Sequence, residues 1–490
     1  MSKKRRGHIF FLLIAIALAL ATGCGDSSSN LSTQATAPLV IISDIHFTPF
    51  YDTELFNDLV NSPVEQWASI FQTSSMSEPL SWGNESNYPL LVRALDSALM
   101  EIGSSPVLLF PGDILAHKFP EKFFELYGKE DEEALRSFVY KTVVFFATQI
   151  RERFGDLPVV FALGNNDSYA GDYKLVPGGE FLADTAEEFY DTLLLGGADH
   201  EGYFKTYPAG GYYVADPPES KVLFVCLNTI LFSRRWLENN SNEGEGIALK
   251  QLDWLEQTLA EAGAAERRVW LIVHIPPGAD IFATVTTYMD KTGHISNAAS
   301  FWEEEYQARF LEISTRYAHV IEAVFAGHTH MDEYRLLLEN DGSAHKASIT
   351  TPSVSPVFGN DPAFKVVTMD RENWELLDYR SVAYHLGSAF PEFSTYYVFS
   401  EAYSTKLPLE PALIALFPKL ATDTLRQQAY ARFYYSGHNA ADNINATNWP
   451  AYWCGIGKMV QEEYIECVNS YRLGGVSTQT TVDNPLTQNQ

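Results

Sequence analysis

Short apolar runs recur through the first three quarters of the chain and indicate strands. They are residues 39–42, 107–110, 159–163, 222–227, 269–273 and 321–325. They are too short for independent helices and rich in β-branched side chains, which is typical of buried strands. Segments with helical spacing of apolar residues lie between them, at residues 90–100, 137–153 and 249–262. This alternation predicts an α/β domain with a substantially parallel sheet.

The pattern changes in the last quarter of the chain. After about residue 379, strand-like runs give way to aromatic, helix-leaning segments that include residues 420–435 and 458–468. We therefore expect a main domain over residues 38–385 and a C-terminal helical subdomain over residues 400–472. Residues 474–490 are polar and lack apolar periodicity, which predicts a flexible tail.

The N-terminus has the layout of an export signal. Basic residues precede an apolar run over residues 9–21 that is too short to be a stable spanning helix. The run ends in Thr22-Gly23-Cys24, which resembles the lipobox of bacterial lipoproteins, although Ala21 stands where that motif usually has leucine. We expect a signal peptide over residues 1–23, lipidation of Cys24, and a polar linker over residues 24–37 that holds the folded body off the membrane. The alternative is an ordinary cleaved signal in which Cys24 has no role.

The other cysteines fit an exported protein, in which disulfides are permitted. Cys454 and Cys467 lie close together in an aromatic, turn-rich region, where a disulfide could hold a small subdomain together. Whether that bond forms is left open at this point. Cys226 lies within the apolar run at residues 222–227, so we expect it to be a buried thiol.

The charge balance limits the partners that the chain can bind. The chain has 34 Lys and Arg residues against 62 Asp and Glu residues, a net charge of 34 − 62 = −28. Such a surplus of acid repels nucleic-acid phosphates and argues against a duplex-binding role. A small phosphate-containing substrate is still compatible with this negative net charge, because bound divalent metal ions can make the electrostatic potential inside one pocket positive. No obligate protein partner is evident.

Five polar clusters, each placed where a predicted strand ends, carry the candidate chemistry. They are Ser43-Asp44-Ile45-His46, Gly112-Asp113-Ile114-Leu115-Ala116-His117, Gly164-Asn165-Asn166-Asp167, His274-Ile275-Pro276-Pro277 and Gly327-His328-Thr329-His330. A single polar residue after a strand is usually a cap or turn residue, but ligands of α/β folds gather where strands end. Strand alternation would place Asp44 and His46 on one side as a chelating pair. The glycines at 112, 164 and 327 would let the backbone turn tightly.

The succession of these motifs, D-x-H, G-D, G-N, H and G-H-x-H, resembles the calcineurin-like metallophosphoesterases. The resemblance implies a sandwich of two mixed β-sheets flanked by helices, with a centre for two divalent metal ions. The ligands it implies are Asp113 as the bridge, with Asp44, His46 and His330 around one metal, and Asn165, His274 and His328 around the other. Two such ions share a water, lower its pKa and neutralise a phosphoryl group during in-line attack. Zinc is the expected metal, and manganese and iron are alternatives.

Longer strings narrow the resemblance to the acid sphingomyelinase-like phosphodiesterases. These strings lie at residues 44–52, 112–117, 274–278, 327–334 and 351–356, within a resemblance that covers roughly residues 39–379. The resemblance implies a phosphodiesterase that acts on a small phosphodiester, a nucleotide-like compound or a phospholipid headgroup. A lipid anchor would favour lipid substrates, whereas the lack of a cysteine-rich saposin-like module ahead of the catalytic core favours soluble ones.

One departure from the family concerns the general acid. The family's G-N-H-[DE] loop is Gly164-Asn165-Asn166-Asp167 in this chain, so Asn166 replaces the histidine that usually faces the leaving group. An amide can donate a hydrogen bond but cannot deliver a proton. His117, four residues after Asp113, matches a second histidine of the acid sphingomyelinase-like members and is our candidate general acid. The alternative is that His117 only orients Asp113.

A function of another class also stays open at this stage. The chain could be a surface lipoprotein that uses a degenerate phosphoesterase fold as a binding module. All seven ligand positions are filled, which favours the enzyme.

Overall fold

The computed structural model describes residues 35–240, 245–338, 344–438 and 443–471. The expected signal peptide, Cys24 and the expected tail at residues 474–490 therefore lie outside the described residues. Strand β1 (Thr36–Ile41) already begins inside the linker expected over residues 24–37. No helix in the described part of the chain is long and apolar enough to cross a membrane.

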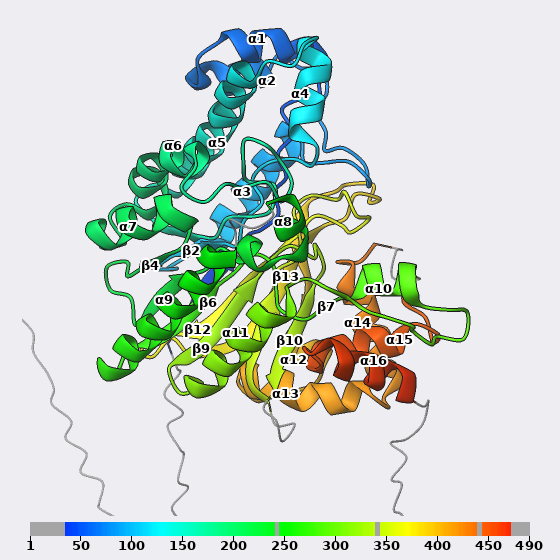
Figure 1. Ribbon diagram of the computed structural model, residues 1–490. Coiled ribbons are helices and arrows are strands. Elements are labelled where there is room, and N and C mark those ends of the chain that lie inside the picture. Colours follow the sequence, from blue (N-terminus) through cyan, green and yellow to red (C-terminus); the bar gives the residue numbers. More distant parts are fainter. Residues whose placement is uncertain (1–34, 241–244, 339–343, 439–442, 472–490) are drawn as a thin grey trace, which may run out of the picture. The chain divides into compact units, whose positions relative to one another are not determined.

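Two six-stranded mixed sheets form the centre of the protein (Figure 1). The first has the order β14 (Phe393–Val398), β13 (Leu376–Tyr384), β12 (Ala363–Asp370), β1, β2 (Leu108–Phe110) and β3 (Val159–Phe161). The second has the order β10 (Glu333–Leu338), β11 (Ala344–Thr350), β9 (Ile321–Ala326), β6 (Arg268–Ile272), β5 (Val222–Cys226) and β4 (Tyr213–Ala215). A small ribbon pairs β7 (Ala279–Asp280) with β8 (Ala299–Ser300). The predicted two-sheet α/β class is confirmed.

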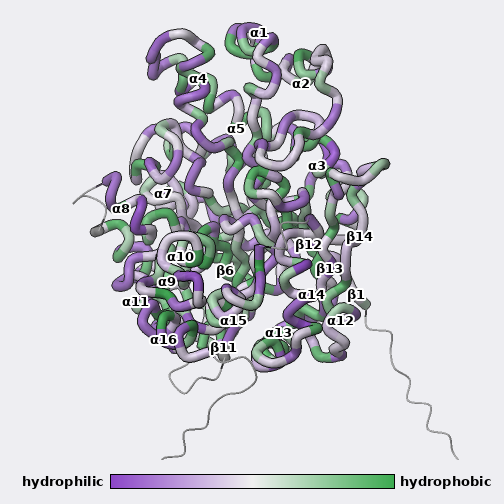
Figure 2. Tube along the Cα trace, turned by 90° about the vertical axis from the view of Figure 1, so that its right-hand side faces the viewer, coloured by the Kyte–Doolittle hydropathy of each residue, from purple (hydrophilic) through white to green (hydrophobic). Residues whose placement is uncertain are grey.

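Each sheet has a parallel part, and these parts explain the apolar runs of the sequence. Strands β1, β2 and β3 pair in parallel, as do β5, β6 and β9. Strands β2 and β3 are buried at every position, so they are apolar throughout rather than alternating. Figure 2 shows hydrophobic segments gathered in the interior, for example around β6. The antiparallel strands β12, β13 and β14 extend the first sheet beyond β1.

Helices flank the two sheets. Those before residue 320 are α1 (Phe56–Asn61), α2 (Trp67–Phe71), α3 (Tyr88–Ile102), α4 (Phe119–Tyr127), α5 (Glu132–Phe154), α6 (Glu180–Phe189), α7 (His200–Gly210), α8 (Arg234–Asn239), α9 (Glu245–Ala264), α10 (Ile281–Tyr288) and α11 (Glu304–Arg316). Helix α3 packs on β1, and α9 packs on β6. The helical segments expected at residues 90–100, 137–153 and 249–262 correspond to α3, α5 and α9.

The C-terminal helices pack directly on the sheets (Figure 1). They are α12 (Phe399–Ala402), α13 (Leu409–Leu420), α14 (Thr424–Tyr434), α15 (Trp449–Gly457) and α16 (Gln461–Ser470). Helix α13 contacts β11 and β13, and α15 contacts β10. Cys454 of α15 and Cys467 of α16 form a disulfide with a Cα–Cα distance of 6.0 Å. Cys226 is buried and unpaired in β5, as expected.

Candidate metal centre

The five polar clusters converge where β1, β2, β3, β6 and β9 end. Backbone hydrogen bonds join neighbouring loops: the Asp44 amide donates to the Gly112 carbonyl at 3.0 Å, and the Gly327 amide donates to the His274 carbonyl at 3.0 Å. The Asn166 amide donates to Asp113 Oδ1 at 2.9 Å. Loops that follow five different strands therefore place their side chains in one buried centre.

Five of the seven expected ligands have a left-handed backbone. The φ angles of these five lie between 46° and 72°; the residues are Asp44, His46, Asp113, His328 and His330. Non-glycine residues adopt this region at a cost in energy, and such residues cluster at functional sites. The expectation that strand alternation pairs Asp44 with His46 is wrong, because β1 ends at Ile41 and both residues lie in the strained loop that follows. The pair still converges, through loop geometry.

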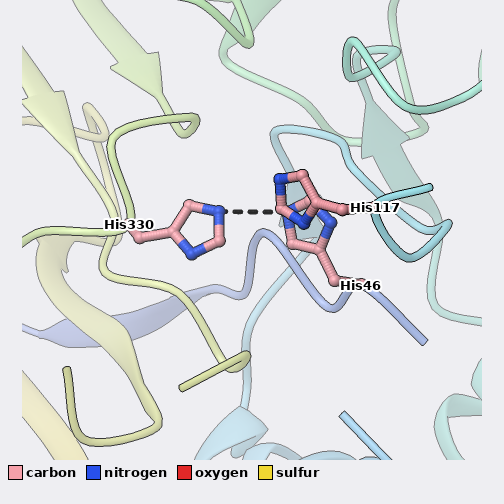
Figure 3. A group of neighbouring side chains, drawn as sticks. All are labelled: His46, His117 and His330. Atoms are coloured by element: carbon pink, nitrogen blue, oxygen red, sulfur yellow. Dashed lines mark hydrogen bonds between the residues drawn. The ribbon is translucent and has the colours of Figure 1, made fainter. Parts of the chain in front are cut away.

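One group of side chains gathers around His46, and Figure 3 draws His46 and His330 of this group together with His117. His46 Nε2 lies 3.0 Å from His330 Nε2, 3.3 Å from Asp113 Oδ2 and 3.9 Å from Asp44 Oδ1. His330 Nε2 lies 3.6 Å from Asp44 Oδ1. These four residues are those expected around one metal.

A second group gathers around His274. Its Nε2 lies 3.2 Å from Asp113 Oδ2 and 3.1 Å from Asn165 Oδ1. One ligand atom from each of Asp113, His274 and His328 lies within 4.8 Å of the others. The four residues expected around the other metal are thus also together, and Asp113 Oδ2 belongs to both groups.

Hydrogen bonds at the outer nitrogens fix the direction of two imidazoles. His46 Nδ1 donates to the Leu115 carbonyl at 3.0 Å, and His274 Nδ1 donates to the Pro111 carbonyl at 2.8 Å. A carbonyl can only accept, so a neutral ring presents the lone pair of Nε2 to the centre. In the first group that lone pair faces a carboxylate oxygen and a second imidazole nitrogen; in the second group it faces a carboxylate oxygen and an amide oxygen. Such converging acceptors fit a cation in each group.

Burial and charge set the protonation of the centre. Burial lowers the pKa of His46 to about 4, and it lowers the pKa values of His328 and His330 well below the ordinary value. Burial alone would raise the pKa of Asp113, but His274 and His46 outweigh it and hold that pKa well below its usual range. Three neutral imidazoles and an ionised carboxylate are the protonation states that metal ligands require.

Two glycines are required by close approach rather than by backbone angle. A Cβ at Gly164 would lie 2.0 Å from Asp113 Oδ1, and one at Gly327 would lie 2.6 Å from Asp44 Oδ2. Gly112 differs, because its φ of +109° is itself a glycine conformation. The loops can bring carboxylates this close only because side chains are missing at these positions.

Asp167 ties the second and third loops together. Its buried carboxylate accepts hydrogen bonds from the backbone amides of Asp113 at 3.0 Å, Ile114 at 2.9 Å and Gly164 at 2.8 Å. The last residue of the G-N-N-D loop is therefore a structural clamp that positions Asp113 and Asn165.

Asp172 orients Asn165, a role that the sequence analysis did not identify. Asn165 Nδ2 donates to Asp172 Oδ1 at 2.7 Å, so that Oδ1 of the same amide faces His274. An unrestrained amide could turn its NH₂ group toward the centre instead.

His117 lies beside the first group and is held by Glu85. Its ring stacks on that of His46 with centroids 4.2 Å apart, as Figure 3 shows. His117 Nδ1 donates to Glu85 Oε1 at 2.9 Å, and Glu85 Oε2 accepts from the hydroxyl of Ser355 at 3.2 Å. Burial alone would lower the pKa of His117, but the hydrogen bond and charge of Glu85 outweigh it and raise that pKa. A protonated His117 at the edge of the centre can donate a proton.

Asn166 turns toward the carboxylate of Asp113. Its Nδ2 donates to Asp113 Oδ2 at 3.1 Å, and the residue is buried. Its Oδ1 is buried and makes no hydrogen bond. This side chain supports Asp113, and of His117 and Asn166 only His117 has a titratable group.

Comparison with known proteins identifies the family of the chain. Residues 37–332 match the family model described as calcineurin-like phosphoesterase. The chain is 23% identical to cyclic GMP-AMP phosphodiesterase SMPDL3A of Mus musculus over 88% of this chain and 91% of the relative. It is 26% identical to acid sphingomyelinase-like phosphodiesterase 3b of Homo sapiens, over 69% of this chain and 71% of the relative. It is 24% identical to sphingomyelin phosphodiesterase of Bos taurus, over 73% of this chain and 54% of the relative.

The family model spans more than half of the chain and includes all seven of the converging side chains. The chain therefore belongs to the calcineurin-like phosphoesterase family, and it is a phosphodiesterase of the acid sphingomyelinase-like kind.

Proposed function

We propose that this phosphodiesterase is exported, works outside the cytoplasm and uses two divalent metal ions, with zinc as the expected metal. The observation that carries the two-metal part of this proposal is the position of Asp113 Oδ2, which lies 3.3 Å from His46 Nε2 and 3.2 Å from His274 Nε2. One carboxylate oxygen shared by two groups of acceptors is the arrangement that a pair of cations needs.

The proposed ligands fall into two sets that share Asp113. Asp44, His46 and His330 complete the first set, and Asn165, His274 and His328 complete the second. Bound divalent ions would lower the pKa of a shared water and neutralise the charge of the phosphoryl group. Asn166 and Asp167 keep the Asp113 loop in place through their hydrogen bonds.

His117 is the proposed proton donor to the leaving group. The water gives up one proton to solvent, its oxygen forms a bond to phosphorus, and the bond from phosphorus to the leaving oxygen breaks. A proton from His117 gives the leaving oxygen its hydrogen, and His117 regains a proton from solvent. Glu85 keeps the ring of His117 in place and favours its protonated form. Asn166 cannot perform this step, because an amide has no proton to transfer at neutral pH.

The proposed substrate is a small phosphodiester, a nucleotide-like compound or a phospholipid headgroup. The relatives of the chain include a cyclic GMP-AMP phosphodiesterase and a sphingomyelin phosphodiesterase. Release of product from sphingomyelin, nucleoside triphosphates and cyclic nucleotides, assayed side by side, selects among these substrates.

Metal content and turnover, measured on one sample, test the enzyme. The purified chain is expected to bind two divalent ions and to cleave bis-p-nitrophenyl phosphate with zinc or manganese, whereas Asp113→Ala abolishes cleavage. Asp184→Ala is the matched control, because Asp184 bonds the exposed Tyr169 hydroxyl rather than the centre. Fewer than two ions together with no cleavage contradicts the proposal. Two ions and bound substrate without turnover would indicate the binding-module alternative.

The proposed location is the cell envelope, with a lipid on Cys24 as the anchor. We expect the wild-type chain to be found in the membrane fraction and to incorporate labelled fatty acid. Cys24→Ala should take up no label and should leave the membrane fraction. An unlabelled wild-type chain in the soluble fraction would favour an ordinary cleaved signal.

A further inference from the structure

An exposed aromatic ring stands beside the candidate metal centre. Phe358 is 54% exposed, and its ring centroid lies 4.6 Å from that of His330 and 5.4 Å from that of His117. His330 belongs to the first ligand group, and His117 is the proposed proton donor. The ring therefore borders the place where an organic group attached to the phosphoryl would leave the centre.

The loop that carries Phe358 is anchored to the centre. The Pro356 carbonyl accepts hydrogen bonds from the backbone amides of Gly359 at 3.1 Å and Gly83 at 3.0 Å. The Ser355 amide donates to the Asp44 carbonyl at 3.1 Å. The fully buried side chain of Asn360 donates to the Ser355 carbonyl at 3.1 Å. The exposure of Phe358 is thus built into an ordered turn, and little conformational freedom is lost when a ligand contacts the ring.

Phe301 provides an internal comparison on the other side of the centre. Its ring lies 5.1 Å from that of His328, but the guanidinium of Arg335 covers it, with Cζ 5.2 Å from the ring centroid. Among the described residues, the ring of Phe358 contacts the rings of the two histidines, and more than half of its surface stays exposed. Phe301 is a packing residue, whereas Phe358 has a surface available to a ligand.

We propose that Phe358 is a specificity-determining residue that stacks on a planar ring of the substrate, such as an aryl group or a nucleobase. This inference rests on the proposed function, because the proposed function places the phosphoryl group of the substrate at the metal centre. An apolar ring next to a charged centre offers no hydrogen bond but gains from contact with another flat ring. The site would thereby prefer phosphoesters with an aromatic organic group over those with a small alkyl group.

Phosphonates with one organic arm test this preference without a leaving group. Binding of phenylphosphonate, cyclohexylphosphonate and methylphosphonate to the metal-loaded full chain is measured by calorimetry. The wild-type chain is expected to bind phenylphosphonate more tightly than methylphosphonate. Phe358→Ala is expected to reduce that ratio about fivefold or more, with methylphosphonate affinity unchanged. Cyclohexylphosphonate should depend less on Phe358, because it cannot stack.

Two further variants complete the design. Phe358→Tyr keeps a flat ring and should keep the preference. Phe282→Ala removes another exposed phenylalanine, 65% exposed on α10, and should leave all affinities unchanged. If Phe358→Ala leaves the ratio of phenylphosphonate to methylphosphonate affinity unchanged, the inference is overturned while the proposed function stays intact. The same holds if phosphocholine, measured in the same way, binds more tightly because of Phe358 and phenylphosphonate does not. Failure of the wild-type chain to bind metal or any phosphonate would overturn the proposed function as well.

Discussion

The side-chain amide of Asn165 donates a hydrogen bond to the carboxylate of Asp172, with 2.7 Å between Nδ2 and Oδ1. This bond decides which end of the amide faces the centre. With Nδ2 engaged, Oδ1 lies 3.1 Å from His274 Nε2 and is available as a neutral oxygen ligand.

Removal of Asp172 should therefore weaken metal binding at the second ligand group. Asp172→Ala frees the amide to turn, and the loss of an outer partner of this type typically costs about 10- to 100-fold in metal affinity. Competition with a chromophoric chelator measures the change. Asp172→Asn retains an acceptor oxygen and should recover part of the affinity, and Asp184→Asn should have no effect. Equal affinity in Asp172→Ala and wild type would show that Asn165 needs no such restraint.

The role of His117 can be separated from metal binding by varying the leaving group. His117→Ala should slow a diester with a poor leaving group, such as a phenyl ester, by about 10²- to 10⁴-fold. A p-nitrophenyl ester needs less proton transfer and should be affected much less. Glu85→Gln should also slow cleavage of the phenyl ester more than cleavage of the p-nitrophenyl ester, but by smaller factors than His117→Ala.

Metal content of the same variants is the necessary control, because His117 lies with His46 and His330 as a possible metal-ligating group. An unchanged content with a selective loss on the phenyl ester supports proton donation. A loss of metal, or an equal loss on both esters, contradicts it.

The strands that the sequence predicted share one physical property. Each apolar run that we identified as a strand lies in a parallel, buried part of a sheet, as β1 and β6 do. Strands β13 and β14 were not predicted, because they carry polar residues at positions that are half exposed or exposed in antiparallel pairs. Helices such as α5 were predicted well because they are long, although their ends were not.

The ligand set could be proposed from motif order, but the geometry that supports it could not. Nothing in the order of residues indicates that Asp44 and His46 have a left-handed backbone conformation rather than the extended conformation of a strand. Glu85 and Asp172 were missed as partners of His117 and Asn165, because a single carboxylate in a polar segment carries no signal until the chain is folded. Phe358 was missed for the same reason: single exposed apolar residues are common on protein surfaces, and the sequence does not indicate which of them lies beside a site.

Metal binding should depend on pH in a direction that follows from His274. Burial alone would lower the pKa of His274, but the carboxylates of Asp113 and Asp44 outweigh it and raise the pKa to about 9 in the absence of a metal ion. A protonated imidazole cannot bind a metal, so protons compete with the ion below that pH. Metal affinity should therefore rise as pH rises from 6 toward about 9.

Chelation at two pH values measures this competition. At the lower pH, a given concentration of chelator should remove the ions more completely and lower the melting temperature further, because bound metal stabilises only the folded chain. Affinity independent of pH over this range would show that His274 is already neutral in the metal-free protein.

The disulfide between Cys454 and Cys467 should stabilise the C-terminal helices rather than the centre. The bond joins α15 to α16 across a sequence separation of 13 residues, and α15 packs on β10. A loop of this length predicts a loss of about 2 to 4 kcal/mol in the free energy of unfolding when the bond is removed. Replacement of both cysteines by serine should lower the urea midpoint accordingly, while phosphodiester cleavage at low temperature changes little, because neither cysteine contacts a ligand group. A reducing agent should produce the same shift in the wild-type chain and none in the double variant. A reductant effect in the double variant would instead indicate that Cys226, the remaining described cysteine and a free thiol in this structure, had been oxidised.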